Sequence, residues 1–130
     1  MIMAEGFNDA NIEEISNLLR DYFDGLYKGD IQKFSNVFHS SSHLYFSDGE
    51  SVTDWPRSEY FEMISKRPSP SSQGLVRHDK ILSINISGPA TAFAIVQCAI
   101  PPRYFTDYLT LLKSDKGWQI ISKTFHTDTH

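Results

Sequence analysis

The sequence contains one cysteine, Cys98, among 130 residues. An intrachain disulfide is therefore impossible, and a zinc site built from cysteines is not expected. His126 and His130 are four residues apart, but they lie at the end of a predicted strand, and this spacing brings side chains together only on a helix. We therefore predict that the protein binds no metal, and no motif for an organic cofactor is present.

The sequence also lacks a cluster of basic residues. It has 12 Lys and Arg against 16 Asp and Glu, a net charge of −4, which disfavours binding to nucleic acid. No run approaches the ~20 apolar residues needed to cross a bilayer. The first six residues lack the basic and apolar regions of a secretory signal. We expect a soluble cytoplasmic protein with no nucleic-acid or membrane partner.

Apolar residues are plentiful enough for one core. Hydrophobic residues make up 40% of the chain and aromatic residues 13%, so a disordered chain is not expected. The length suits one domain. We predict a single domain over residues 1–130, with residues 1–10 as a loose N-terminal segment.

Helical patterns occupy the first half of the chain. Apolar side chains recur at helical spacing over residues 12–27, and Asn11 resembles an N-cap. Gly29 fits the end of this helix, and Asp30 fits the N-cap of a shorter second helix that follows at once. The spacing therefore predicts two helices joined by a tight corner.

A third helix and a series of strands follow. Thr53 or Asp54 is predicted to cap the third helix, which Pro68 ends because proline has no N–H to donate. From Leu75 onward the apolar period changes to two, which is typical of strands. The predicted long strands are residues 75–86, 90–100, 104–113 and 118–126, with a shorter hairpin at residues 43–53.

This element order is that of an α+β fold, in which the helices gather on one face of an antiparallel sheet. Strands this long need a strongly curved sheet to enclose a helix. Some strands are apolar on both faces, as at Ile120 and Ile121. Since the helices cover only one face, we predict that a second copy of the chain covers the other, giving a homodimer through the sheet.

Several segments together carry a resemblance to a known family. They are Tyr22–Asp30, Phe38–His39, Arg67–Pro70, Arg77–Asp79, Asp107–Lys113, Gly117–Ile120 and Phe125–His126. In this order the chain resembles the nuclear transport factor 2-like superfamily, and within it the putative lumazine-binding branch. The resemblance implies a cystatin-like cone with three N-terminal helices packed on the curved sheet, usually as a dimer. It does not imply one reaction, because the superfamily includes isomerases, dehydratases, cyclases, binding modules and assembly domains.

Three polar residues are candidates for catalysis. If His39, Asp107 and His126 point into the cone, they could form an acid–base set, since imidazole titrates near neutral pH and can pass a proton either way. Such a set suits proton abstraction beside a carbonyl, dehydration or activation of water. The alternative is that all three are ordinary polar groups with satisfied hydrogen bonds.

Aromatic residues are candidates for ligand binding. A tyrosine hydroxyl at position 22 or 27 could donate to a ligand carbonyl, and rings at further positions could stack on a flat heterocycle. The same residues are also ordinary core and interface material. The candidate ligand-binding residues are Tyr22, Tyr27, Tyr45, Trp55 and Tyr108.

Two other features have a functional and a structural interpretation. Cys98 lies on an apolar strand and fits a small buried residue better than a nucleophile, which needs a cationic neighbour or a helix N-terminus. The loop from Arg67 to Gly74 could hold an anion through Arg67 and its serine hydroxyls, or it could be a solvated connection.

Three functions remain open from the sequence. The first is a small-molecule binding protein that holds a compact, partly flat organic ligand in the cone. The second is a cofactor-independent isomerase, dehydratase or cyclase with a histidine as general base. The third is a dimerisation or assembly domain without a ligand. A cavity of about 300 Å³ or more would support the first two.

Overall fold

The computed structural model describes residues 5–130, with side chains described from residue 9. The helices are α1 (Glu5–Lys28), α2 (Ile31–Val37) and α3 (Arg57–Lys66), followed by the short 3-10 turn η1 (Ser71–Gln73). The strands are β1 (Phe38–Ser47), β2 (Val52–Pro56), β3 (Lys80–Ser87), β4 (Thr91–Ile100), β5 (Arg103–Ser114) and β6 (Gly117–Thr129). Residues 5–10 are part of α1, whereas residues 1–4 lie outside the described part.

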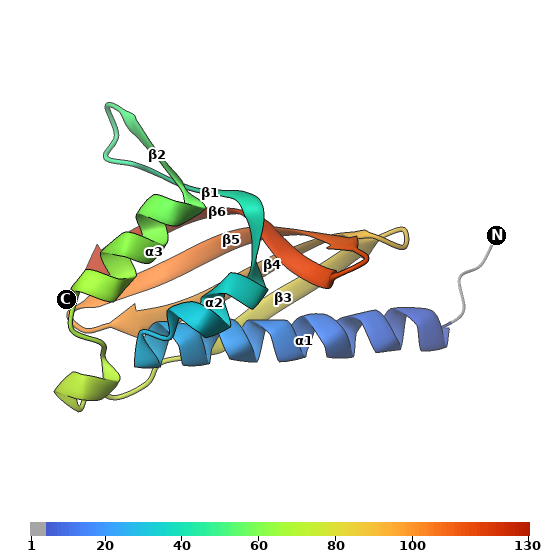
Figure 1. The fold of residues 1–130 in the computed structure, drawn as a ribbon, viewed down its shortest axis with the longest axis horizontal. Helices are drawn as coiled ribbons and strands as arrows, with labels where there is room; N and C mark the ends of the chain where they lie inside the picture. The colour runs from blue at the N-terminus through green and yellow to red at the C-terminus, as the bar shows by residue number, and fades with distance from the viewer. Residues whose placement is uncertain (1–4) are drawn as a thin grey trace.

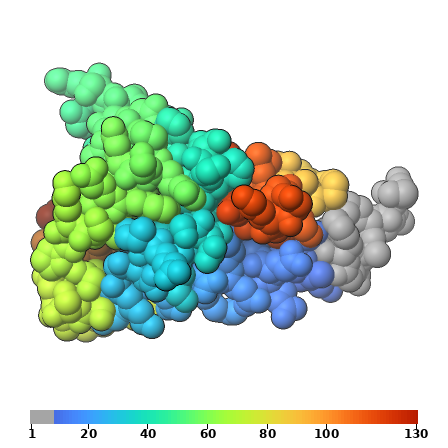
Figure 2. Space-filling model, in the orientation of Figure 1, coloured from blue at the N-terminus to red at the C-terminus, as the bar shows by residue number. Residues whose placement is uncertain are grey.

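The strands form one six-stranded sheet in the order β2-β1-β6-β5-β4-β3. Neighbouring strands are antiparallel except β1 and β6, which are parallel. The sheet is strongly curved and does not close. Figure 1 shows α1 lying along one face of the long strands, and Figure 2 shows α2, α3 and η1 forming a continuous cover on the side viewed. The predicted fold class is confirmed.

The corner between α1 and α2 forms as its sequence predicts. Gly29 has φ +66°, a left-handed conformation that glycine adopts without a steric cost. Asp30 caps α2, its carboxylate accepting the N–H of Lys33 at 3.1 Å. One turn earlier, a Cβ added to Gly25 would lie 2.5 Å from Cδ1 of Phe34. The two helices can therefore pack closely only because position 25 has no side chain.

The predicted N-caps of α1 and α3 are wrong. Asn11 lies within α1, where its Oδ1 accepts hydrogen bonds from Trp118 Nε1 at 3.1 Å and Lys113 Nζ at 3.2 Å. It therefore fastens the helix to the β5–β6 hairpin. Thr53 and Asp54 continue β2, paired with β1, so α3 begins later, at Arg57. Thr53 and Asp54 therefore pair in a strand and do not cap a helix.

The strand β3 begins at Lys80, five residues later than the pattern predicts. The hydroxyl of Tyr27 donates to the carbonyl of Leu75 at 2.7 Å, which holds the preceding segment against α1. The pairing of β3 with β4 also shifts register between Ile81 and Ser83. The single apolar face predicted for this strand is therefore interrupted.

The core lies between the helices and the concave face of the sheet. Aromatic rings from α1, α2, β1 and α3 pack at its centre, with the centroids of Tyr22 and Phe34 5.9 Å apart. Within this core, Asp107 and Lys123 are the two charged residues classed as buried in the described part of the chain. No helix among residues 5–130 has both the length and the apolar character to cross a membrane.

Candidate functional site

A buried ion pair lies on the inner face of the sheet. Asp107 on β5 is 0% exposed and Lys123 on β6 is 6% exposed, and Lys123 Nζ lies 3.9 Å from Asp107 Oδ2. Removing two charges from water costs several kcal/mol for each ion, at order of magnitude, and their attraction offsets this only with good geometry and further hydrogen bonds. A buried pair of this kind therefore marks a candidate site.

The Asp107 carboxylate is satisfied on one oxygen. Its Oδ2 accepts the hydroxyl of Tyr22 at 2.6 Å and the thiol of Cys98 at 3.5 Å. Its Oδ1 is buried and has no hydrogen-bond partner among the described residues. Buried polar atoms are normally paired. Since this oxygen is not, it can accept a proton or a hydrogen bond from a bound molecule.

The Lys123 ammonium is surrounded by aromatic rings. It donates a hydrogen bond to the hydroxyl of Tyr60 at 3.2 Å. Its Nζ also lies 5.1 Å, 5.0 Å and 5.2 Å from the ring centroids of Tyr22, Tyr60 and Phe125. Attraction to ring faces stabilises a desolvated cation. These contacts fix the position of the ammonium without neutralising it.

The protonation states follow from burial and from the carboxylate. Burial lowers the pKa of Lys123, but the charge of Asp107 together with the contributions of Tyr60 and Cys98 outweighs burial, so the pKa lies above its ordinary value. Burial and the same carboxylate both raise the pKa of Tyr22 and that of Cys98. At neutral pH the carboxylate therefore faces an ammonium, a phenol and a thiol. Cys98 is not a thiolate, which agrees with its interpretation as a buried residue.

An internal cavity of about 40 Å³, partly open to solvent, adjoins this network. That volume exceeds the need of one water molecule but is far below the several hundred Å³ of typical ligand pockets. In the described part of the chain, this cavity is therefore much smaller than the wide cone cavity considered from the sequence. The cavity is lined by Leu26, Leu44, Trp55, Tyr60, Met63, Arg67, Phe105, Lys123 and Phe125.

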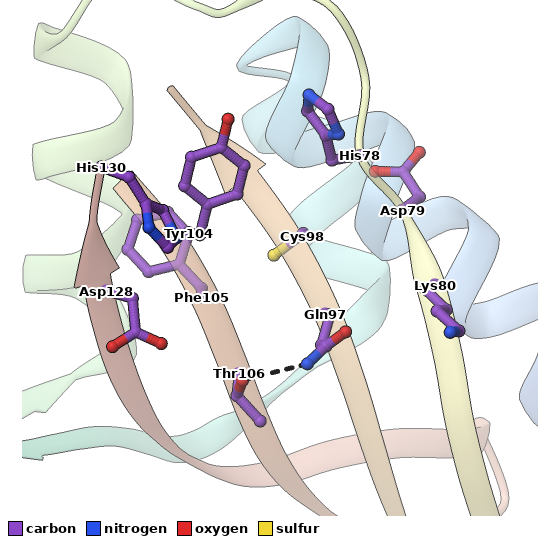
Figure 3. Close-up of a pocket in the computed structure, with 10 residues that line it drawn as sticks. All are labelled: His78, Asp79, Lys80, Gln97, Cys98, Tyr104, Phe105, Thr106, Asp128 and His130. Atoms are coloured by element: carbon purple, nitrogen blue, oxygen red, sulfur yellow. Dashed lines mark hydrogen bonds between the residues drawn. The ribbon is translucent and has the colours of Figure 1, made fainter. Parts of the chain in front are cut away.

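A larger hollow of about 430 Å³ lies at the ends of β3, β4, β5 and β6 (Figure 3). Of its lining residues, Cys98 is also part of the network and Phe105 also lines the internal cavity. Its charged side chains are exposed, as at Asp79 and Asp128. Water screens such charges strongly. We therefore place the candidate site at the smaller cavity, where the charges are buried.

The predicted set His39, Asp107 and His126 does not assemble. His39 lies at the start of β1, where its Nδ1 accepts the N–H of Ser41 at 3.0 Å. The side chain of His126 is 72% exposed and its Nε2 lies 2.9 Å from Oδ1 of Asp128. Asp107 alone of the three lies in the buried network.

A register shift in β6 explains both the misplaced histidine and the missed lysine. Leu111 pairs with Ile120, but the preceding Thr110 pairs with Ser122, so β6 contains one extra residue. Strict alternation from Ile120 would turn His126 inward and Lys123 outward. The extra residue reverses both directions, because side chains alternate between the two faces of a strand.

The predicted ligand-binding residues divide into two groups. Tyr22 bonds to Asp107 and Trp55 lines the internal cavity. The other three lie elsewhere: Tyr27 donates to a loop carbonyl, Tyr45 stacks on a histidine of its own strand at 6.0 Å, and Tyr108 is 51% exposed. Tyr60 on α3, which bonds to Lys123, is not among the residues predicted from the sequence.

Comparison with known proteins places the chain in a family. Residues 10–126 match the family described as putative lumazine-binding, and the chain belongs to this family. It is similar to a nuclear transport factor 2-like protein of unknown function from Shewanella baltica OS155, with 25% identity and a TM-score of 0.84 over 99% of this chain and 100% of that one.

Two further relatives extend the comparison. A nuclear transport factor 2-like protein of unknown function from Silicibacter pomeroyi DSS-3 has a TM-score of 0.82 at 18% identity, over 93% of this chain and 98% of that one, which shows the fold alone. The aldolase FrzH from a Cladobotryum species is 25% identical over 128 residues, covering 96% of this chain and 98% of that protein.

Proposed function

We propose that this protein is a cofactor-independent enzyme that performs acid–base chemistry on a small carbonyl compound. The observation that carries the proposal is the buried ion pair, in which the ammonium of Lys123 forms part of a cavity wall while Asp107 keeps it charged. A fixed positive charge in a dry site stabilises negative charge that develops on a substrate oxygen. The base is a carboxylate, in place of the histidine considered from the sequence.

Each residue has a distinct role in this proposal. The Lys123 ammonium donates a hydrogen bond to the substrate carbonyl oxygen, while Tyr60 holds the ammonium in place. The unpartnered Oδ1 of Asp107 removes a proton from the carbon beside the carbonyl, and the C–H electron pair becomes that of the enolate. Asp107 is fully enclosed and does not itself line the cavity of about 40 Å³, so this step requires the cavity to widen before the substrate reaches the oxygen.

The enolate then has two outcomes that balance. If the substrate carries a β,γ double bond, Asp107 returns the proton to the γ-carbon and the double bond moves into conjugation with the carbonyl, which isomerises the substrate. Otherwise the enolate carbon bonds to a second carbonyl carbon and the resulting alkoxide takes the proton, which is an aldol addition. The second outcome is supported by the similarity to the aldolase FrzH. Imine formation on Lys123 is disfavoured, because its raised pKa keeps the amine protonated and only a neutral amine attacks a carbonyl.

A binding protein without turnover is the second candidate. Aromatic side chains dominate the cavity wall near Lys123, including Trp55 and Phe105, and such walls suit a flat organic ligand. A binder requires the ammonium only as an anchor and makes no use of the free oxygen of Asp107. The predicted homodimer remains a prediction, for which the mass in solution is the test.

Exchange of substrate hydrogens tests the proposed chemistry. In D₂O, the purified protein should exchange the α-hydrogens of small ketones such as butanone and cyclohexanone for deuterium. Proton NMR measures the rate at which the α-hydrogen signal is lost. Lys123→Met should lower the rate about 100-fold or more, as removal of one oxyanion donor does. Lys66→Met removes a charge from the exposed end of α3 and serves as the control. An exchange rate equal to that in buffer alone for every ketone would contradict the proposal. Equal losses of rate in Lys123→Met and Lys66→Met would also contradict it.

A further inference from the structure

Arg67 has a guanidinium without an acceptor. The residue follows α3, is half-buried, and lines the internal cavity together with Lys123. Among the described residues it makes no side-chain hydrogen bond and no ion pair. The other half-buried arginine, Arg57, is different: its guanidinium donates to the carbonyl of Phe38 at 2.9 Å and stacks on the ring of Phe61 at 5.1 Å.

Glu59 and Glu62 line an open surface hollow together with Arg67, but among the described residues neither forms an ion pair with it, and none of the residues that line the internal cavity is acidic. Burial lowers the pKa of the Arg67 guanidinium, Tyr60 raises it and Arg103 lowers it again, so the pKa lies below its ordinary value. Burying a charge without a partner is costly, and the guanidinium has five N–H donors in a planar fork. The chemistry missing from this wall of the cavity is therefore an anion with two acceptor oxygens, since such a group accepts parallel hydrogen bonds from the fork.

We propose that Arg67 binds the carboxylate of the substrate, so that the substrate class is a small keto acid. The assignment has two parts, a carboxylate bound by Arg67 and a keto oxygen bound by Lys123. The second part rests on the proposed function. Both cations line the same cavity of about 40 Å³, so the carboxylate and the carbonyl lie only a few bonds apart. A compact acid fits this site better than a bicyclic heterocycle.

A phosphate is the less suitable anion here. Recognition of phosphate usually adds backbone N–H groups and hydroxyls to the cation. The serines that follow Arg67 are already engaged with each other: the N–H of Ser72 donates to Ser69 Oγ at 3.1 Å, and its Oγ donates to the Ser69 carbonyl at 2.8 Å. None of the loop serines considered with Arg67 from the sequence lines the cavity, so the guanidinium acts there without them.

Calorimetric titration of the full chain tests the assignment without requiring turnover. The probes are pyruvate and 4-oxopentanoate, each compared with its neutral methyl ester. The variants are Arg67→Met, Arg67→Lys and the control Lys66→Met, which removes a neighbouring cation exposed to water and paired with Glu62. Urea unfolding of each variant establishes that the compared proteins are folded.

At least one acid should bind wild-type protein about tenfold or more tightly than its ester, as expected for a charge-assisted pair of hydrogen bonds. Arg67→Met should reduce this ratio to about one, and Arg67→Lys should restore part of it. Lys66→Met should keep the wild-type ratio. Failure of both acids to bind, equal binding of acid and ester, or a ratio unchanged in Arg67→Met would each overturn the assignment.

The two proposals fail in different ways. If the acids bind through Arg67 but no α-hydrogen exchanges in the bound acid, the acid–base chemistry is wrong and the carboxylate site stands. If neutral ketones exchange through Lys123 while the acids gain nothing from Arg67, the chemistry stands and the carboxylate site is wrong.

Discussion

Strand β6 contributes Lys123 to a buried ion pair and both members of an exposed histidine–carboxylate contact. Lys123 and Asp107 are 7% and 0% exposed at their side chains and lie 3.9 Å apart, whereas His126 and Asp128 are 72% and 62% exposed and lie 2.9 Å apart. The closer pair, His126 and Asp128, has the smaller effect on stability and on its neighbours, because water screens an exposed pair. The buried pair perturbs the pKa of the groups around it.

The comparison teaches that distance alone does not identify a site. A histidine close to a carboxylate resembles a catalytic pair, but at an exposed position it affects little else. The buried pair brings an unsatisfied oxygen, a fixed ammonium and a cavity into one place. Replacing equivalent members of the two pairs should therefore separate their effects clearly.

The largest difference is expected between the two carboxylates. Asp107→Ala leaves the ammonium of Lys123 buried without a partner and should lower the free energy of unfolding by about 3–5 kcal/mol. Asp128→Ala should change it by less than about 0.5 kcal/mol. Urea unfolding measures both, and similar values for the two variants would show that burial does not distinguish the pairs.

Removal of one hydrogen bond to the buried carboxylate should have the next largest effect. Tyr22→Phe deletes the donor to Asp107 and should cost about 1.5–3 kcal/mol, the range for hydrogen bonds to charged groups. Tyr108→Phe, at an exposed position of β5, is the matched control and should stay within about 0.5 kcal/mol. Equal midpoints in urea for the two variants would contradict the assigned hydrogen bond.

Stability should fall at alkaline pH because of the buried network. Cys98, Tyr22 and Lys123 all have a raised pKa in the folded chain, so above pH 9.0, the ordinary value of the thiol, the unfolded chain holds fewer protons than the folded chain. Their contribution is complete below that pH and is lost as pH rises, by up to about 1.4 kcal/mol per pH unit for each proton.

Replacing the thiol provides the control for this pH dependence. Cys98→Ala removes one of the three groups and should flatten the alkaline decline, most visibly just above pH 9.0 where the thiol ordinarily titrates. Urea unfolding between pH 7 and 11 measures the slope. A free energy of unfolding that stays level or rises with pH would contradict the raised pKa values.

The smallest effect is expected at the exposed histidine. His126→Gln should change the free energy of unfolding by less than about 0.5 kcal/mol and leave α-hydrogen exchange within about twofold of wild type. The control for exchange is Lys123→Met, which should lose most of the rate. A loss at position 126 as large as that at position 123 would restore the histidine as a catalytic residue.

Local patterns predict much of the fold but little of the site. The corner at Gly29 and Asp30 and the long hairpin were predictable, because turn residues and alternation lie next to each other in the sequence. Lys123 was not, because the extra residue in β6 depends on pairing with β5. Neither Tyr60 nor the unsatisfied oxygen of Asp107 has a local signal, since both depend on contacts between distant segments.

The central claim is that the buried pair serves chemistry and not stability, and one double variant tests it. Asp107→Leu with Lys123→Met replaces both charges by apolar groups, which often leaves stability about unchanged. Its rate of α-hydrogen exchange should be compared with wild type at equal unfolding midpoints in urea. We predict a folded protein that exchanges no faster than buffer. A folded double variant that exchanges at the wild-type rate would contradict the claim.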